Sequence, residues 1–130
     1  MLWLRDPDAC CGIRKIEPLA RALRVFDAWL SGRKRYHGAD RAALSVFEAD
    51  RTGRIKINPL AGWSRVRVEE EFTRRDLPRH PLAADGYRSI GCITCTDRVR
   101  PDEDLRAGRW RGLEKTECGI HLPGPRCVEP

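Results

Sequence analysis

The chain has 130 residues, of which 41% are hydrophobic, and this length supports one modest core rather than two independent domains. Charged residues make up 34% of the chain and its net charge is +6, which favours an anionic partner such as a phosphate or sulfate compound. The basic residues are scattered and form no stripe or recognisable module, so we expect no nucleic-acid partner.

The six cysteines are well below the density of a small secreted protein held by disulfides. No apolar run is long enough for a signal peptide or a membrane span, so we expect a cytoplasmic protein without a membrane partner. In that compartment cysteines serve metal binding or catalysis more often than disulfides.

The elements expected in chain order begin with a possible strand at residues 2–5. A helix is predicted from Glu17, because apolar residues recur at spacings of three and four from Leu19 to Leu30 and Gly32 is placed to end the helix. A second short helix is predicted over residues 41–49.

Residues 54–58 alternate with a period of two and precede Pro59, which predicts a short strand. Ser64 is a suitable N-cap for a third helix that ends before Pro78. The last fifty residues, rich in proline and glycine, are predicted to be mostly loop. Because one or two short strands cannot form a complete parallel sheet, the fold class is interpreted as part of a larger α/β domain.

Two cysteine pairs stand far apart in the sequence, Cys10 with Cys11 and Cys92 with Cys95. Four thiolates from two segments could enclose one metal centre. Adjacent cysteines rarely aim at a single zinc ion, whereas a cubane iron–sulfur cluster offers each of them a separate iron. The alternative stays open that the tandem pair consists of buried small hydrophobes beside a surface CxxC turn.

Cys118 lies within three residues of Lys115 and His121. Positive neighbours favour the thiolate, so this cysteine is a candidate nucleophile, with an inert cysteine in a basic tail as the alternative. Cys127 is interpreted as a free thiol rather than a resolving partner.

Several segments together carry a family resemblance. They are Asp8-Ala9-Cys10-Cys11-Gly12-Ile13-Arg14-Lys15-Ile16-Glu17-Pro18-Leu19, Asn58-Pro59-Leu60-Ala61-Gly62-Trp63, Gly86 to Thr96, Arg106-Ala107-Gly108-Arg109-Trp110, and Lys115 to His121. Their order and spacing resemble the thioredoxin-dependent adenylylsulfate reductases of the phosphoadenylylsulfate reductase family, and the match is to the C-terminal half only.

The resemblance implies the C-terminal part of an adenine nucleotide alpha-hydrolase-like fold, with residues 1–100 in the α/β domain and residues 101–130 forming a tail. It implies that adenylylsulfate is reduced to sulfite and AMP through a thiosulfonate on Cys118, with thioredoxin as the electron donor and His121 assisting. It also implies a 4Fe-4S cluster on Cys10, Cys11, Cys92 and Cys95. The residues implied in substrate binding are Lys15, Lys34, Arg35, Arg106 and Arg109.

Two departures from the family leave alternatives. Gly32-Arg33-Lys34-Arg35 has a lysine where the family usually has arginine, which loses a two-pronged donor. No glycine-rich phosphate loop occurs, so we expect the nucleotide-binding N-terminal half to be supplied by a separate chain or lost, with a homo-oligomer also possible. The alternative functions are a non-catalytic iron–sulfur fragment and a phosphoadenylylsulfate reductase.

Overall fold

The computed structural model describes residues 1–50 and 52–121, which divide into two compact units. The first unit comprises residues 1–32 and 45–59 together with the segment that starts at residue 117, and the second comprises residues 33–44 and 60–116. Helices and a three-stranded sheet make this an α/β structure, in agreement with the expected class. None of the described helices has the length and apolar character that crossing a membrane requires.

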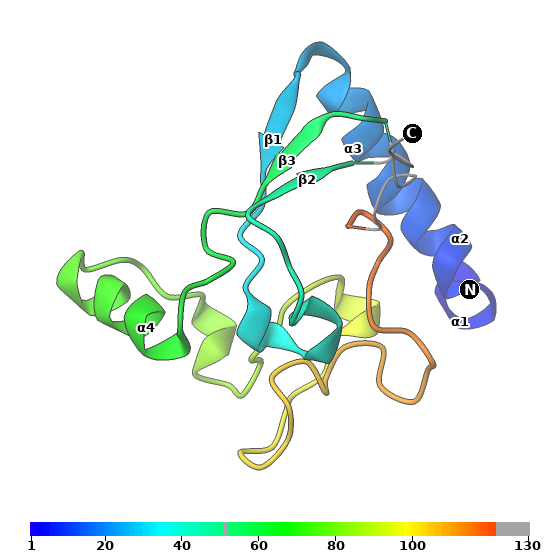
Figure 1. Cartoon of the computed structure of the whole chain (residues 1–130). Coiled ribbons are helices and arrows are strands. Elements are labelled where there is room, and N and C mark those ends of the chain that lie inside the picture. The colour runs from blue at the N-terminus through cyan, green and yellow to red at the C-terminus, as the bar shows by residue number, and fades with distance from the viewer. Residues whose placement is uncertain (51, 122–130) are drawn as a thin grey trace. The chain divides into compact units, whose positions relative to one another are not determined.

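The first unit begins with a nearly continuous helical run, drawn in blue in Figure 1. It contains α1 (Leu2–Arg5), α2 (Pro7–Cys11), a π-helical stretch (Gly12–Ile16), α3 (Glu17–Ala22) and a 3-10 turn (Leu23–Val25). Asp6 caps α2, because its Oδ1 accepts a hydrogen bond from the Ala9 amide at 2.9 Å. The expected strand at residues 2–5 is therefore wrong.

The expected helix from Glu17 is confirmed only in its first part. Phe26 is already extended, with φ −117° and ψ 138°, and β1 (Ala28–Leu30) follows. The three-to-four spacing that carried the prediction beyond residue 25 is thus coincidental. Pairing with a distant strand overrides the local pattern.

The sheet has the strand order β1-β3-β2. Strand β3 (Ile55–Ile57) lies in the centre, parallel to β1 and antiparallel to β2 (Phe47–Ala49). The predicted strand at residues 54–58 is confirmed, but the predicted helix over residues 41–49 is wrong, because its end forms β2. Asp50 tightens the β2–β3 connection by accepting hydrogen bonds from the amides of Thr52 and Arg54 at 2.8 and 3.1 Å.

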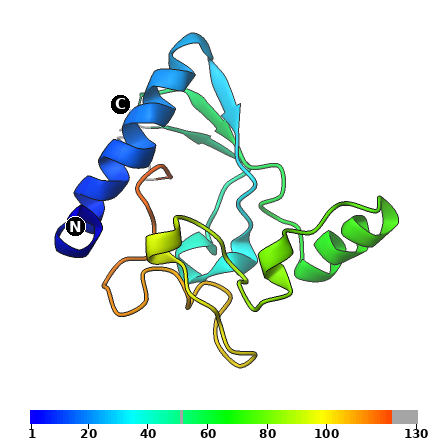
Figure 2. The same ribbon diagram turned by 180° about the vertical axis from the view of Figure 1, so that it is seen from behind.

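One face of the sheet carries Trp29, Glu48 and Lys56 in register. Lys56 is only 3% exposed, and its Nζ lies 3.3 Å from a Glu48 oxygen and 5.3 Å from the centre of the Trp29 ring. Leu19 and Ala20 of α3 line a common pocket with Trp29, so α3 covers this face, and the opposite views in Figures 1 and 2 agree with this placement.

The second unit contains α4 (Arg65–Arg74) and several 3-10 turns (Arg35–His37, Ala39–Arg41, Pro81–Ala83 and Ile93–Cys95). The Ser64 side chain accepts a hydrogen bond from the Arg67 amide at 3.1 Å, which confirms the predicted N-cap. The rest of residues 81–121 is mostly loop, as predicted. Leu44, Ala61, Val99 and Trp110 form the buried apolar centre of this unit.

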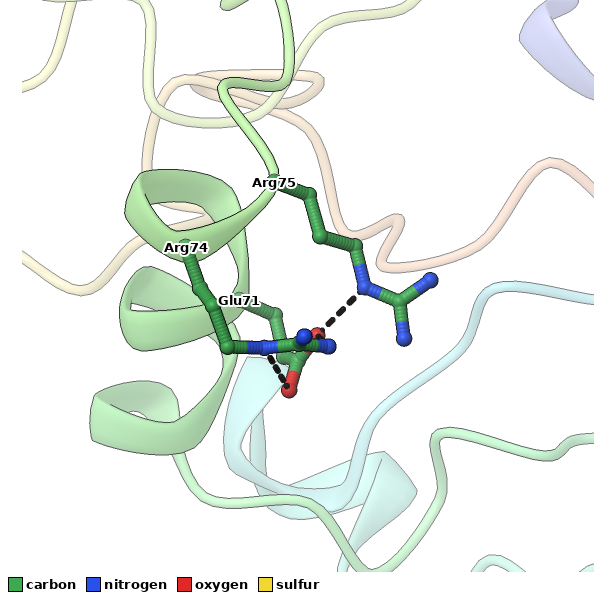
Figure 3. Close-up of polar contacts among 3 residues, drawn as sticks. All are labelled: Glu71, Arg74 and Arg75. Carbon is green, nitrogen blue, oxygen red and sulfur yellow. Dashed lines mark hydrogen bonds and ion pairs between the residues drawn. The ribbon is translucent and has the colours of Figure 1, made fainter.

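Helix α4 buries no side chain, and ion pairs stabilise its last turn. Figure 3 shows Glu71 between Arg74 and Arg75, each of which donates to a Glu71 oxygen at 2.6 Å. These hydrogen bonds, from Arg74 first and then from Arg75, lower the pKa of Glu71 to about 2. The folded state therefore prefers the charged carboxylate.

We predict that Glu71→Gln lowers the melting temperature by about 1 °C at neutral pH, because exposed ion pairs contribute little. The Glu71 pKa is depressed on folding, so its contribution is present above the ordinary value of 4.5 and is lost as the pH falls toward about 2. Melting curves across this range should converge for the two proteins. Glu70→Gln, on the same helix without an ion-pair partner among the described residues, is the control, and convergence in that variant as well would contradict the prediction.

Candidate active site

The tandem cysteines lie where the N-terminal helical run changes geometry. Cys10 and Cys11 end α2, and the π-helical stretch Gly12–Ile16 begins directly after them. Cys11 is buried at 8% exposure and Cys10 is half-buried. Lys15 is half-buried in the π-helical stretch. Single π-helical turns inside α-helices occur frequently at functional sites, and this one separates the cysteine pair from α3.

The CxxC segment forms the turn that the sequence predicted. Cys92 precedes the 3-10 turn Ile93–Cys95, and the Cys95 amide donates to the Cys92 carbonyl at 3.0 Å. Thr96 reinforces the turn, because its hydroxyl donates to the Cys92 carbonyl at 2.8 Å and accepts from the Gly91 amide at 3.1 Å. Both thiols are half-buried, and neither forms a disulfide.

Arg109 supports the same turn from a distant part of the second unit. Its Nε donates to the Cys95 carbonyl at 3.2 Å, and its guanidinium lies 4.4 Å from the centre of the Trp110 ring. A Cβ at Gly91 would lie 2.2 Å from Arg109 Nη2, so a larger residue there would require the end of the Arg109 side chain to shift. The contacts described for Arg109 are thus structural, and its role in substrate binding stays a prediction.

None of the four candidate ligands forms a disulfide, and Cys10 and Cys11 lie in the first unit whereas Cys92 and Cys95 lie in the second. The end of α2 and the CxxC turn each present two thiols, which suit thiophilic metals, so the chemistry of the donor set fits the expected cluster. Within residues 1–50 and 52–121, no three His, Cys, Asp or Glu side chains gather closely enough to hold a metal ion.

Cys118 is buried at 7% exposure in the first unit. Gly119, with φ at +90°, turns the chain directly after it, and Gly119 and Ile120 line the pocket that α3 and Trp29 also line. The His121 ring stacks on Trp29 with the ring centres 5.9 Å apart and the planes 9° apart. Cys118 therefore stands three residues before a histidine that is anchored on the sheet.

A basic group in the second unit surrounds His37. Burial, followed by the nearby charges of Lys34 and Arg41, lowers the pKa of His37 to about 4. Arg106 adds to this effect, whereas the Asp104 carboxylate opposes it. Burial and Arg41 also lower the pKa of Lys34. Such a concentration of positive charge around a neutral imidazole suits an anion.

Two members of this basic group were not among the predicted site residues. Arg41 is buried at 7% exposure, and His37 ends the 3-10 turn that Arg35 begins. The signal in the sequence was a histidine that follows a run of three basic residues after one tyrosine, with Arg41 four positions beyond the histidine. Arg35 itself is exposed, and its Nε donates to the Leu44 carbonyl at 2.9 Å.

The residues near Cys118 in the sequence include Lys115, which the structure assigns to the second unit. The Lys115 ammonium lies 5.6 Å from the centre of the buried Trp110 ring, and the Arg106 guanidinium lies 6.0 Å from the same centre. Trp110 is 3% exposed, and its buried ring contacts the cationic side chains of Arg106 and Lys115. Cys127 lies outside the described residues.

We predict that an NMR titration of His37 has its midpoint near pH 4, and that Arg106→Ala raises this midpoint because a positive neighbour is removed. The folded-state pKa lies below the ordinary value of 6.5, so the unit loses stability as the pH falls from 6.5 toward 4. Inorganic sulfate should raise the midpoint if an anion binds within the basic group. A midpoint near the ordinary value of 6.5 would contradict this arrangement.

Comparisons with known proteins agree on one family. The model of the phosphoadenosine phosphosulfate reductase domain matches residues 1–98. A protein of Chelativorans sp. named adenosine 5'-phosphosulfate reductase is 55% identical over 119 residues, which are 92% of this chain and 48% of that protein. A protein of Gloeobacter violaceus named phosphoadenosine 5'-phosphosulfate reductase is 48% identical over 120 residues, which are 90% of this chain and 50% of that protein.

The crystal structure of a phosphoadenylyl-sulfate reductase from Candida auris, in a phosphate complex, is similar to this structure with a TM-score of 0.62 at 34% sequence identity. The similarity covers 74% of this chain and 46% of that one. The chain spans about half the length of the relatives it matches. Since the family model covers most of the sequence and the fold agrees, the chain belongs to the phosphoadenosine phosphosulfate reductase domain family.

Proposed function

We propose that the chain is the part of an adenylylsulfate reductase that carries the nucleophilic cysteine, and that the whole enzyme reduces adenylylsulfate to sulfite and AMP. The observation that carries the proposal is the 55% identity to the Chelativorans protein over 119 residues, together with Cys118 in its Lys-Thr-Glu-Cys-Gly-Ile-His setting. A purely structural metal module would have no need of this cysteine.

In the proposed first step, the Cys118 thiolate attacks the sulfur of adenylylsulfate. A sulfur–sulfur bond forms, the bond from that sulfur to the bridging oxygen breaks, and AMP leaves with that oxygen and its electron pair. Because AMP is a good leaving group, the protein must chiefly orient the thiolate and neutralise sulfate and phosphate charge. Burial of Cys118 at 7% exposure means that the thiol must be uncovered before it reacts.

In the proposed second step, a thiolate of thioredoxin attacks Cys118 Sγ and releases sulfite. The second thioredoxin thiol then resolves the mixed disulfide, so thioredoxin is oxidised to its disulfide while sulfur is reduced to sulfite. The proposed assignment gives His121 the role of assisting Cys118. Stacking on Trp29 supports that assignment, because it limits the positions the imidazole can take.

Positive side chains of the second unit supply the charge for the substrate in this proposal. Lys34 and Arg106 lie among the groups that depress the pKa of His37, so both belong to a concentrated positive field. Arg35 and Arg109 are the other proposed contacts, and Arg109 doubles as a support for the CxxC turn. Guanidinium groups suit sulfate and phosphate because they donate two parallel hydrogen bonds.

Cys10, Cys11, Cys92 and Cys95 are proposed to hold a 4Fe-4S cluster, which when bound would supply a fixed negative field and structural support rather than electrons. Lys15 lies in the π-helical stretch that follows the tandem pair, and its ammonium is proposed to favour bound sulfate. Buried and half-buried thiols outside any disulfide, at the end of α2 and in the CxxC turn, support this ligand set.

We predict that anaerobic reconstitution with iron and sulfide gives the absorbance of a four-iron cluster in the wild-type chain, and that Cys10→Ser removes it because one iron loses its ligand. Cys118→Ser is the matched control and should retain the absorbance. Stoichiometric zinc in place of iron would refute the cluster assignment.

We predict that Cys118→Ser lowers sulfite release by more than about 10³-fold, because a serine hydroxyl is a far weaker nucleophile at neutral pH. The assay uses adenylylsulfate, thioredoxin and the chain together with the part of the Chelativorans relative that it does not span. Mass spectrometry of the wild type without thioredoxin should find a thiosulfonate, in which a sulfonate group is bonded to Cys118 Sγ. A sulfonate on another cysteine, or unchanged turnover in the variant, would overturn the role of Cys118.

The 3'-phosphorylated substrate is the second candidate, because the Gloeobacter relative and the Candida structure carry names of phosphoadenylylsulfate reductases. Running the same assay with both nucleotides separates the two. A higher kcat/KM for the 3'-phosphorylated compound would change the assignment of the substrate without changing the chemistry at Cys118.

A further inference from the structure

The face of the sheet opposite α3 is apolar throughout. Strand register places six side chains side by side on it, two from each strand. They are Ala28 and Leu30, Phe47 and Ala49, and Ile55 and Ile57. Alternation along each strand puts Trp29, Glu48 and Lys56 on the other face, which α3 covers.

This apolar face is open to solvent. Leu30 is 71% exposed, Phe47 is 68% exposed and Ile55 is 53% exposed, whereas Lys56 on the covered face is only 3% exposed. The burial pattern is thus the reverse of the usual one, in which apolar side chains are covered and a lysine faces water. A contiguous exposed apolar surface of this kind marks a docking site.

The topology indicates what covers this face. Strands β1 and β3 are parallel, and sheets with parallel strands occur in layered folds in which helices cover both faces. Helix α3 accounts for one layer. A second copy of the sheet is a poorer occupant, because sheets that pack face to face are characteristically antiparallel.

The length of the relatives indicates where the covering helix comes from. The chain accounts for 48% of the Chelativorans protein and 46% of the Candida protein chain, so each carries a comparable length of polypeptide beyond the matched part. We propose that the face formed by Leu30, Phe47 and Ile55 docks an amphipathic α-helix belonging to the part of the family fold that this chain does not span. The helix would present apolar side chains every three or four residues to the sheet.

This inference rests on family membership and on the sheet geometry, and not on the chemistry proposed for Cys118. Binding can therefore be measured without turnover. A failure of docking would leave the reaction at Cys118 to be judged by its own assay, and an inactive Cys118 would leave docking unaffected.

The test is coexpression of the full chain with an affinity-tagged polypeptide containing the part of the Chelativorans relative that this chain does not span. The wild-type chain should copurify with this polypeptide, and analytical ultracentrifugation should show a one-to-one complex. Phe47→Glu and Leu30→Glu should each lower the affinity at least tenfold, because a carboxylate would be buried against an apolar helix.

Val66→Glu is the matched control, since Val66 is 66% exposed and lies on α4 in the second unit. Its affinity should equal that of the wild type. Hydroxyl-radical footprinting of the wild-type chain, which needs no substitution, should show that Phe47 and Leu30 are protected in the complex.

Three results would overturn the proposal. They are the absence of copurification, a complex in which Phe47 and Leu30 remain as reactive as in the chain alone, and a homodimer of this chain that Phe47→Glu dissociates while no heterologous complex forms. The last result would assign the apolar face to a second copy.

Discussion

The buried ammonium of Lys56 on the central strand constrains the whole first unit. A charge that is only 3% exposed must be compensated, and it lies 3.3 Å from Glu48 on β2 and 5.3 Å from the Trp29 ring on β1. Both neighbours of β3 are therefore required. Fully buried Asn58 extends the same arrangement, because its Nδ2 donates to Glu48 at 2.7 Å and to the Ser45 carbonyl at 2.9 Å.

The same face of the sheet determines where the candidate nucleophile lies. Trp29 contacts Lys56 on the sheet, stacks on His121 and lines a pocket with α3, Gly119 and Ile120. The segment that carries Cys118 is thus held by an aromatic stack rather than by regular secondary structure. Such an attachment orders the segment without the cooperative hydrogen bonds of a strand, so it can be displaced at modest cost.

The CxxC turn of the second unit depends on close approach of the backbone. Gly91 leaves room for the Arg109 guanidinium, and a Cβ at Gly108 would lie 2.2 Å from the Asp97 carbonyl oxygen. Gly108 therefore allows the close backbone approach at Asp97, next to the bridge between Thr96 and Arg109. Arg109 thereby joins the cysteine turn to the buried Trp110, and through this ring to Arg106 and Lys115.

The sequence by itself determined the family, because its motifs stand in a recognisable order along the chain. It also determined the strand at Ile55–Ile57, the Ser64 cap of α4 and the turn between Cys92 and Cys95, because the signal for each lies within a few neighbouring residues. Only the tertiary structure decided that residues 28–30 and 47–49 are strands, since their partner β3 lies elsewhere in the sequence. Arg41 and His37 were likewise missed, because burial among other cations depends on contacts between distant segments.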